Sequence, residues 1–424
     1  MSIDNQYKAY AVKVNIGSGC IVQPSSNEYS YVITAKHNVL PNIENNTLPQ
    51  VSTTNEIPIE ANQIYTHPNP DIDLAIIKIA YQENIELIIK PNVKDYSTLY
   101  LYGFPENKSQ DDYKAKKAIA QLIEKNPPFY VLSSKSFSTQ DDVVGFSGCG
   151  VFQEIDDIIY LSGIEFRMDS YNDEEARINI YPIDLIEEII QNYIDQLEKA
   201  QPIYMNNFSF LRDDSFRLEV DALDEERIEA TRNTLRNKAL NIIQSDITPY
   251  GIKELFKERI LLDDKCSEHL STRNIWVAWL EFLTIMNIIK YENIESSSLT
   301  EIFNAFRLKY SNKDDWTDLI KNDLLNSDYL GLAVDSTIIV STKKAPKNNF
   351  KLPKGKLVNL VKVPDKKGMR TDNGINHPFN AFNFVHLEYF KTDCIQQRLE
   401  LYENINDENE LLNILRNQYN ELFN

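Results

Sequence analysis

One serine of this chain stands in a setting suited to acyl transfer. A serine hydroxyl needs a base to take its proton, a carboxylate to orient that base, and N–H donors for the developing oxyanion. Ser147 lies in the run Gly145-Phe146-Ser147-Gly148, which predicts a tight turn leading into a strand. Gly145 allows a sharp turn, and Gly148 allows the main chain to pass close behind the hydroxyl. An ordinary Gly-Ser hairpin turn fits the same run equally well.

A histidine and an aspartate supply the other two groups, and each adjoins an apolar strand. His37 ends the run YVITAKH, and Asp73 directly precedes the run LAIIKI. The apolar strand after Asp73 argues against a simple surface acid. Asp71 lies two residues earlier, on the same face of an extended chain, and is the alternative carboxylate.

These settings resemble those of the trypsin-like serine peptidases. The T-A-x-H, D-L-A and G-x-S-G motifs of that family occur here in the chymotrypsin order of His, Asp, Ser. The resemblance covers about residues 8–200. It implies a catalytic triad of His37, Asp73 and Ser147, with an oxyanion hole formed by the N–H groups of Gly145 and Ser147.

Two positions depart from the family pattern. Asn38 follows the histidine where secreted members have a cysteine, and Phe146 precedes the serine where zymogen-type members have an aspartate. In those members the aspartate pairs with the new N-terminus that activation cleavage creates. Phe146 cannot form that pair, so control of activity must come from the second domain or a partner. Cys149 lies two residues beyond the motif position, and a small buried thiol is expected there rather than a nucleophile.

Fewer sequence positions indicate the substrate preference than indicate the triad. In trypsin-like enzymes the residue six before the serine often forms the pocket floor, and here that residue is Asp141. An acid there would favour Lys or Arg before the scissile bond. A solvated turn of Asp141 and Asp142 is the alternative. The strand that forms the pocket wall includes Arg167 and Met168, which could crowd the cleft.

The order of elements predicts two domains, at 1–204 and 205–424. Short runs rich in Val, Ile and Tyr over residues 9–180 predict an all-β sandwich or barrel, and the resemblance specifies the chymotrypsin-like double barrel. Apolar residues at helical spacing predict a closing helix over 184–200. The remainder is expected to be α+β and mainly helical, including helices over 272–290 and within 297–325, with strand-like runs returning later.

Composition narrows the class of protein. The 424 residues carry a formal net charge of −19, which argues against general nucleic-acid binding. No long apolar run predicts a membrane span, and no signal peptide is apparent, so the cytosol is the expected location. The four cysteines are widely separated, so neither a metal site nor a disulfide framework is expected. No cofactor is predicted.

Residues 343–370 are a basic exception, with ten Lys or Arg and one Asp. The segment could contact nucleic-acid phosphates through Lys351, Lys354 and Lys356, or dock on an acidic protein surface, or form a solvated hairpin. Phe350 is the single aromatic in it, so base stacking is not indicated.

A peptidase domain followed by an α+β domain resembles bacterial anti-phage defence effectors, such as proteins of the ABC-three-component systems. That layout implies a regulated intracellular serine endopeptidase with a protein substrate and a protein partner, for example an ATPase from the same operon. A binding protein built on an inactive peptidase fold is the first alternative. A nucleic-acid sensor acting through the basic segment is the second.

Overall fold

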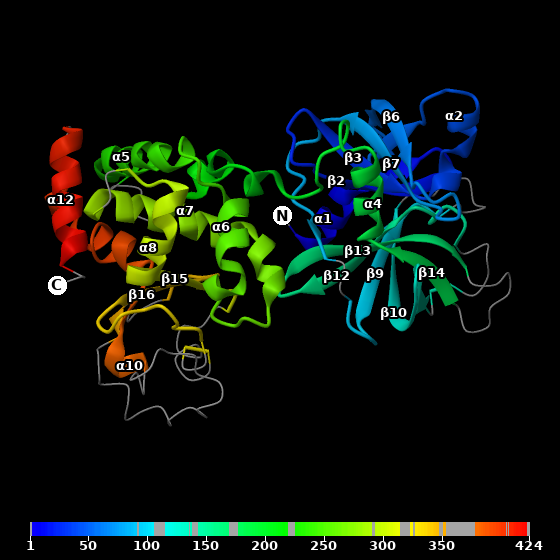
Figure 1. The fold of residues 1–424 in the computed structure, drawn as a ribbon. Coiled ribbons are helices and arrows are strands. Elements are labelled where there is room, and N and C mark those ends of the chain that lie inside the picture. The colour runs from blue at the N-terminus through cyan, green and yellow to red at the C-terminus, as the bar shows by residue number, and fades with distance from the viewer. Residues whose placement is uncertain are drawn as a thin grey trace. The chain divides into compact units, whose positions relative to one another are not determined.

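The computed structural model describes residues 2–90, 93–105, 115–134, 136–137, 143–168, 177–218, 225–290, 293–313, 323–324, 327–346, 351–352, 378–403, 405 and 407–421. The chain divides into two units, Met1–Ile203 and Tyr204–Asn424 (Figure 1). Each unit has its own hydrophobic core. The N-terminal unit holds the residues with the predicted chemistry.

The first barrel of the N-terminal unit has seven strands in the order β5-β4-β1-β2-β3-β7-β6. The strands are β1 (Ala11–Val14), β2 (Gly17–Val22), β3 (Tyr29–Thr34), β4 (Val51–Thr53), β5 (Pro58–Ile59), β6 (Ala61–Thr66) and β7 (Ala75–Ala80). Every residue of β2 and β3 is buried, including the polar residues Ser18, Ser30 and Thr34. The two edge strands of this sheet, β5 and β6, are separated by a single residue in the chain. The two edges therefore lie close together, and the barrel is nearly closed.

The second barrel follows in the order β12-β9-β10-β11-β14-β13-β8. Its strands are β8 (Ile88–Ile89), β9 (Thr98–Gly103), β10 (Lys116–Asn126), β11 (Phe129–Ser133), β12 (Gly150–Ile155), β13 (Ile158–Met168) and β14 (Arg177–Pro182). An additional pairing of β12 with β13 closes the ring. The predicted all-β double barrel is therefore confirmed.

Helices flank the two barrels. At the N-terminus lies α1 (Ile3–Tyr10), whose Tyr7 ring stacks on Tyr102 of β9 at 5.7 Å. A short helix, α2 (Leu40–Glu44), follows the histidine segment. The expected closing helix is α4 (Leu185–Asn192), which buries Ile186, Ile189 and Ile190 on one face. It ends earlier than the periodicity predicts, because the chain turns at Tyr193.

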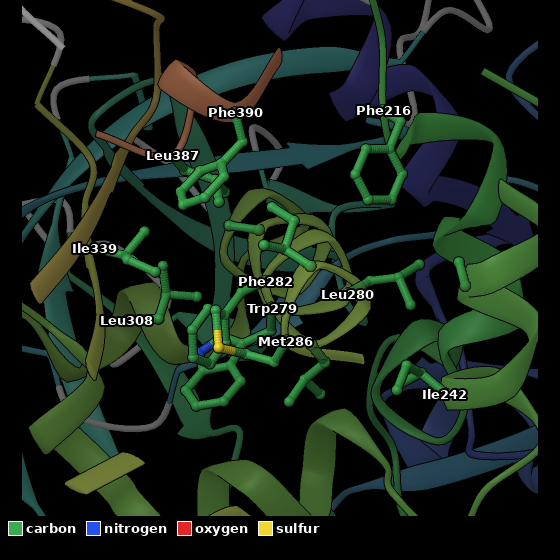
Figure 2. Packing of buried hydrophobic residues seen from close by; sticks show 14 of the residues in the cluster. Phe216, Ile242, Trp279, Leu280, Phe282, Met286, Leu308, Ile339, Leu387 and Phe390 are labelled. Atoms are coloured by element: carbon green, nitrogen blue, oxygen red, sulfur yellow. The ribbon is translucent and has the colours of Figure 1, made fainter. Parts of the chain in front are cut away.

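The C-terminal unit surrounds α7 (Arg273–Ile289), thirteen of whose seventeen residues are buried. Figure 2 shows Trp279, Phe282 and Met286 of this helix at the centre of the core. The other helices are α5 (Glu225–Ile243), α6 (Pro249–Phe256), α8 (Leu299–Ala305), α10 (Pro378–Ala381), α11 (Tyr389–Thr392) and α12 (Glu408–Asn420). A four-stranded sheet has the order β15-β16-β18-β17, with β15 (Phe306–Ser311), β16 (Thr337–Thr342), β17 (Lys351–Leu352) and β18 (Asn383–His386).

The helical prediction for 297–325 was wrong over β15. The strand carries Arg307 and Lys309, whose charge suggests an exposed surface, yet both residues are fully buried. The Arg307 guanidinium donates to the carbonyls of Asp328 and Leu330 at 3.0 and 2.6 Å, so its polar groups are satisfied by main chain from a distant segment. A local pattern carries no trace of those partners.

No helix in the described part of the chain combines the length and the apolar character needed to cross a bilayer. No group of three or more His, Cys, Asp or Glu side chains in those residues could hold a metal ion. The four cysteines are free thiols, three of them buried.

The core of the C-terminal unit depends on Trp279, which is 1% exposed and stacks on Phe256 at 6.0 Å. We expect Trp279→Ala to lower the free energy of unfolding of this unit by about 3–5 kcal/mol, because the cavity cannot collapse fully. Leu255→Ala is the control, since Leu255 is 50% exposed on α6 and its loss is expected to cost less than about 0.5 kcal/mol. Equal losses in a denaturant titration would contradict the assignment of this core.

Candidate active site

The turn that carries Ser147 depends on two glycines. Gly145 and Gly148 both have φ of 90°, a left-handed conformation that glycine enters without steric cost. The Phe146 amide donates to the Val143 carbonyl at 2.8 Å, so the main chain coils tightly before the serine. The turn therefore presents Ser147 between two positions that other residues would strain.

Gly148 is also the point at which this turn touches the first barrel. A Cβ at Gly148 would lie 2.1 Å from the Ser18 carbonyl oxygen and 2.3 Å from Thr34 Oγ1, which leaves no room for a side chain. The Ser18 amide donates to the Ser147 carbonyl at 2.8 Å, and the Thr34 hydroxyl donates to the Ser18 carbonyl at 2.7 Å. These bonds hold the serine against β2 and β3.

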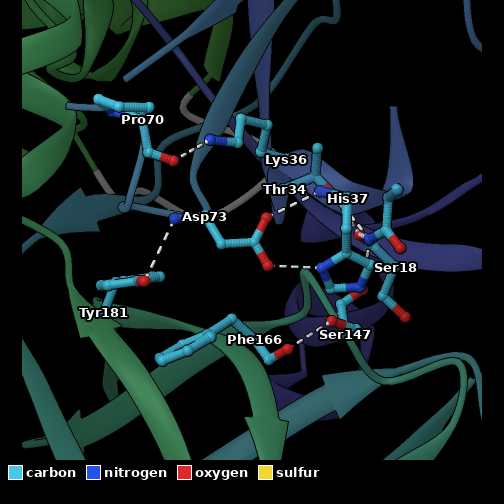
Figure 3. A network of polar contacts seen from close by, with 10 residues as sticks. Ser18, Thr34, Lys36, His37, Pro70, Asp73, Ser147, Phe166 and Tyr181 are labelled. Carbon is cyan, nitrogen blue, oxygen red and sulfur yellow. Dashed lines mark hydrogen bonds and ion pairs between the residues drawn. The ribbon is translucent and has the colours of Figure 1, made fainter. Parts of the chain in front are cut away.

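His37 lies in a single 3₁₀ turn, Lys36–Asn38, directly after β3. Its ring Nδ1 is 2.5 Å from Oδ2 of Asp73, and its amide donates to Asp73 Oδ1 at 2.8 Å (Figure 3). The main chain of Asp73 is held as well, because its amide donates to the Tyr181 hydroxyl at 3.2 Å. Both oxygens of the carboxylate therefore bond to the same histidine, which fixes the orientation of the imidazole.

The environment of Asp73 keeps it ionised. Burial acts to raise its pKa, but the hydrogen bonds and charge of His37 outweigh burial, and the pKa lies below the ordinary value. An ionised carboxylate can stabilise the imidazolium that forms when histidine accepts a proton. The alternative carboxylate, Asp71, is exposed, and its amide bonds to Asn69. The structure thus brings Asp73, not Asp71, to His37.

The Ser147 hydroxyl donates to the Phe166 carbonyl of β13 at 3.0 Å (Figure 3). The main chain of Ser147 is tied to the histidine segment by a different bond, from the Asn38 amide group to the Ser147 carbonyl at 2.7 Å. Catalytic hydrogen bonds are often loose before substrate binds and tighten in the complex. The structure therefore holds the serine turn against the histidine segment, while the Ser147 hydroxyl is bonded to β13.

The Gly145 carbonyl is held toward the first barrel. It accepts a hydrogen bond from the buried Ser18 hydroxyl at 2.5 Å, and that hydroxyl accepts in turn from the Phe104 amide at 2.8 Å. This pair of bonds fixes the peptide group that follows Gly145, within the turn whose N–H groups are predicted to bind the oxyanion. The oxyanion role itself stays a prediction.

Three residues support the site although no chemical motif identifies them. Ser18 and Tyr181 occupy ordinary strand positions, and only barrel closure brings them to the serine turn and to Asp73. Asn38 carried a weak signal, since it stands where secreted relatives have a cysteine. Its side chain donates to Thr34 Oγ1 at 3.0 Å as well as to the Ser147 carbonyl, so it links β3 to the serine turn.

A buried acid also lies beside the serine turn. Glu165 of β13 is 0% exposed, and neither of its carboxylate oxygens has a hydrogen-bond partner among the residues that the structure describes. Burial, and to a smaller extent the charge of Asp73, hold the pKa of Glu165 well above its usual range. This environment therefore favours the neutral form of the Glu165 carboxyl, whereas that of Asp73 favours the ionised form.

The other predicted site residues are placed in part. Asp141 lies outside the described residues, as do Lys354 and Lys356. Arg167 is exposed at 5.2 Å from the Phe166 ring, and Lys351 is exposed in β17. Met168 ends β13, but its side chain is not among those described. Cys149 is fully buried, and burial, with a smaller contribution from Glu165, raises the pKa of its thiol well above the usual value. That environment suits a structural thiol better than a nucleophile.

The C-terminal unit has a cavity of about 600 Å³ at the carboxyl ends of the parallel strands β16 and β18. Lys343 and Lys344 line it after β16, and Glu281 lines it from α7. The Lys391 ammonium lies 3.2 Å from Glu281 and 2.7 Å from Glu388, so the wall is built on a buried ion pair. Open α/β sheets commonly bind ligands at this end of their strands.

Comparison with known proteins gives one family. The model for C-terminal domain 4 of the ABC-three component (ABC-3C) systems matches residues 180–396. Among solved structures, the inactive form of the Rv3671c protease is 15% identical, covers 44% of this chain and 90% of its own, and has a TM-score of 0.33. A serine-to-alanine mutant of Rv3671c from M. tuberculosis H37Rv, also inactive, is 14% identical, covers 45% and 90%, and has the same TM-score. No curated protein matches the chain.

We expect Gly148→Ala to destabilise the N-terminal unit by about 4 kcal/mol or more, because strain at φ of 90° adds to the clash with the Ser18 carbonyl. Gly251→Ala is the control, since Gly251 is exposed in α6 and an added Cβ there meets only Thr248 Oγ1 at 3.2 Å. Its effect is expected to stay within about 1 kcal/mol. Chemical denaturation of both variants checks this, and a Gly148→Ala protein as stable as wild type would refute the close contact.

The raised pKa of Glu165 predicts a pH-dependent stability. Above about pH 4.5 the unfolded chain loses this proton while the folded protein keeps it, so ionisation favours unfolding. Wild type should therefore lose stability relative to Glu165→Gln as pH rises from 5 to 7, by up to about 1.4 kcal/mol per pH unit. Denaturation of both proteins at several pH values measures the difference, and a difference that does not change with pH would show that Glu165 is ionised in the folded state.

Proposed function

The chain belongs to the family defined by C-terminal domain 4 of the ABC-three component systems, and from that premise we propose that it is a serine endopeptidase of anti-phage defence. The contact between His37 Nδ1 and Asp73 Oδ2 at 2.5 Å is the observation that supports this most strongly. It fixes a histidine by a carboxylate, beside a serine held on a two-glycine turn. That combination is what acyl transfer at serine requires.

In the proposed mechanism, Ser147 Oγ attacks the scissile carbonyl carbon while His37 Nε2 takes the hydroxyl proton. Asp73 holds Nδ1–H and stabilises the imidazolium. When the C–N bond breaks, His37 gives the proton to the leaving amine, and an acyl-enzyme remains on Ser147. Water then attacks the acyl group with His37 again acting as base, which releases the acid and restores the serine.

The oxyanion of each tetrahedral intermediate would be bound by the N–H groups of Gly145 and Ser147. The hydrogen bond from the Ser18 hydroxyl to the Gly145 carbonyl supports this assignment, because it ties the serine turn to the first barrel. Donors that are fixed before the reaction need no reorganisation when charge develops.

Control of the enzyme is assigned to residues 205–424 and to a partner. Attack on substrate requires the Ser147 hydroxyl to leave the Phe166 carbonyl and turn to His37, so the bond of 3.0 Å belongs to a resting arrangement. With Phe146 in place of an aspartate, a new N-terminus cannot drive that change. A protein partner, such as an ATPase from the same operon, is the proposed trigger, and the cavity beyond β16 and β18 is one candidate surface for it.

A fluorophosphonate probe tests the proposed nucleophile directly. We expect labelling of wild type and none of Ser147→Ala, because the probe requires an activated serine. Labelling that increases when lysate or operon partners are added would support partner control. The control is Ser162→Ala on β13, which removes a buried hydroxyl that the mechanism does not use.

The role of Asp73 can be measured by the cleavage of a peptide substrate. Asp73→Asn is expected to lower kcat by roughly 10⁴-fold, because an amide cannot stabilise the imidazolium and favours the wrong tautomer. Asp71→Asn is the matched control, and its kcat is expected to stay within a few-fold of wild type. If wild type neither labels nor cleaves under any condition, a binding protein on an inactive peptidase fold becomes the better account.

A further inference from the structure

Glu165 has a buried carboxyl group without a hydrogen-bond partner in the part of the chain that the structure describes. In the register of β13 and β14, Glu165 faces Ile180, which belongs to the core of the second barrel. Cross-strand partners project on the same face of a sheet, so the carboxyl is directed into that barrel. Burying a carboxyl group without a hydrogen bond lowers the free energy of unfolding much more than burying a hydrogen-bonded carboxyl group does.

A second buried glutamate among the described residues, Glu281, shows how such a group is usually accommodated. Glu281 of α7 is 3% exposed, and it accepts from the Phe216 amide at 2.6 Å and pairs with the Lys391 ammonium at 3.2 Å. Glu165 has neither kind of contact among the described residues. An apolar residue of the same size would fill the position at lower cost. The acid is therefore better explained by a partner that arrives from outside.

The main chain of Glu165 lies directly against the nucleophile turn. Its carbonyl accepts from the Gly148 amide at 2.8 Å, and its amide donates to the Cys149 carbonyl at 3.0 Å. The next carbonyl, that of Phe166, accepts the Ser147 hydroxyl. The strand register shifts between Glu165 and Arg167, which bends β13 at this point. Because Ser147 attacks the carbonyl carbon of the residue before the scissile bond, the side chain of that residue enters next to this segment.

We infer that Glu165 is a specificity-determining residue, whose carboxylate binds the ammonium or guanidinium of a Lys or Arg before the scissile bond. The inference rests on the proposed peptidase function. A cation is the ligand that a buried, unpaired carboxylate binds most strongly, and both oxygens would be used by a guanidinium. Since Glu165 is closed to solvent in this structure, the cation reaches it when the contacts between β13 and the serine turn open.

The same opening would release Ser147 from the Phe166 carbonyl. Specificity and activation would then be linked, because a cationic side chain stabilises the arrangement in which the hydroxyl is free to turn to His37. Glu165 is distinct from the pocket acid that the sequence indicates, Asp141, which lies six residues before the serine. The two assignments can be separated by substitution.

The first test compares the ratio of kcat/KM for peptides with Lys or Arg before the scissile bond to kcat/KM for otherwise identical peptides with norleucine. Wild type is expected to favour the cationic peptides, and Glu165→Gln to reduce the ratio by about 100-fold. Asp71→Asn is the matched control, because Asp71 is an exposed acid, and its ratio is expected to fall by less than about tenfold. Asp141→Asn tests the competing assignment, and a larger loss in that variant than in Glu165→Gln would overturn the inference. An unchanged ratio in Glu165→Gln, or no cationic preference in wild type, would overturn the inference. Failure of wild type to label with fluorophosphonate would instead indicate that the proposed function is wrong.

The second test uses benzamidine, a small amidinium, and needs no turnover. Calorimetry is expected to show binding to wild type that releases a proton, since Glu165 is neutral before the cation arrives, and binding at least tenfold weaker in Glu165→Gln. Circular dichroism checks that the variant is folded. Equal affinity in folded wild type and variant, or binding without proton release, would contradict the assignment.

Discussion

The closeness of the serine turn to the first barrel is the constraint on which the site depends. Gly148 passes so near to the Ser18 carbonyl and Thr34 hydroxyl that any side chain would collide with them. The serine belongs to the second barrel and the histidine to the first. Their relative position would otherwise vary with the packing of two separate sheets. Gly148 leaves no room for a Cβ, and Ser18 and Asn38 donate hydrogen bonds to the Ser147 carbonyl. These contacts fix the position of the serine turn relative to the histidine segment.

The surroundings of two carboxyl groups at the site shift their pKa values in opposite directions. Asp73 receives two hydrogen bonds from His37, which lower its pKa. Glu165 has no hydrogen-bond partner among the described residues, and burial raises its pKa. Neighbouring acids whose environments push their pKa values apart commonly have different tasks. Here the ionised acid orients the proposed base, and the neutral acid is proposed to await a cation. The cost of Glu165 to stability is consistent with a residue kept for function rather than for folding.

Much of the site could be predicted because its signals are local. A glycine on each side of Phe146-Ser147, a histidine at the end of an apolar strand and an aspartate before another are all visible in short windows of sequence. The contributions of Ser18 and Tyr181 were not predictable, since they depend on which strands become neighbours when the barrels close. Glu165 was equally hidden, because a polar residue in a β run suggests an exposed face.

The same limit explains the error in the C-terminal unit. Arg307 and Lys309 made the segment 306–311 look unlike a buried strand. The Asp328, Leu330 and Leu261 carbonyls that accept from them belong to distant segments of the chain. The regular helix α7 followed from apolar periodicity over 272–290, whereas β15 within 297–325 did not. Function in this unit was indicated by layout alone, which the family match now supports at the level of the domain.

The most direct measurement of the central claim is a crystal structure of the protein after reaction with a neutral fluorophosphonate. The account predicts a phosphonyl group on Ser147 Oγ, its oxygen within hydrogen-bond distance of the Gly145 and Ser147 amides, and His37 still bonded to Asp73. Modification of another residue, or a phosphonyl oxygen directed away from both amides, would contradict it.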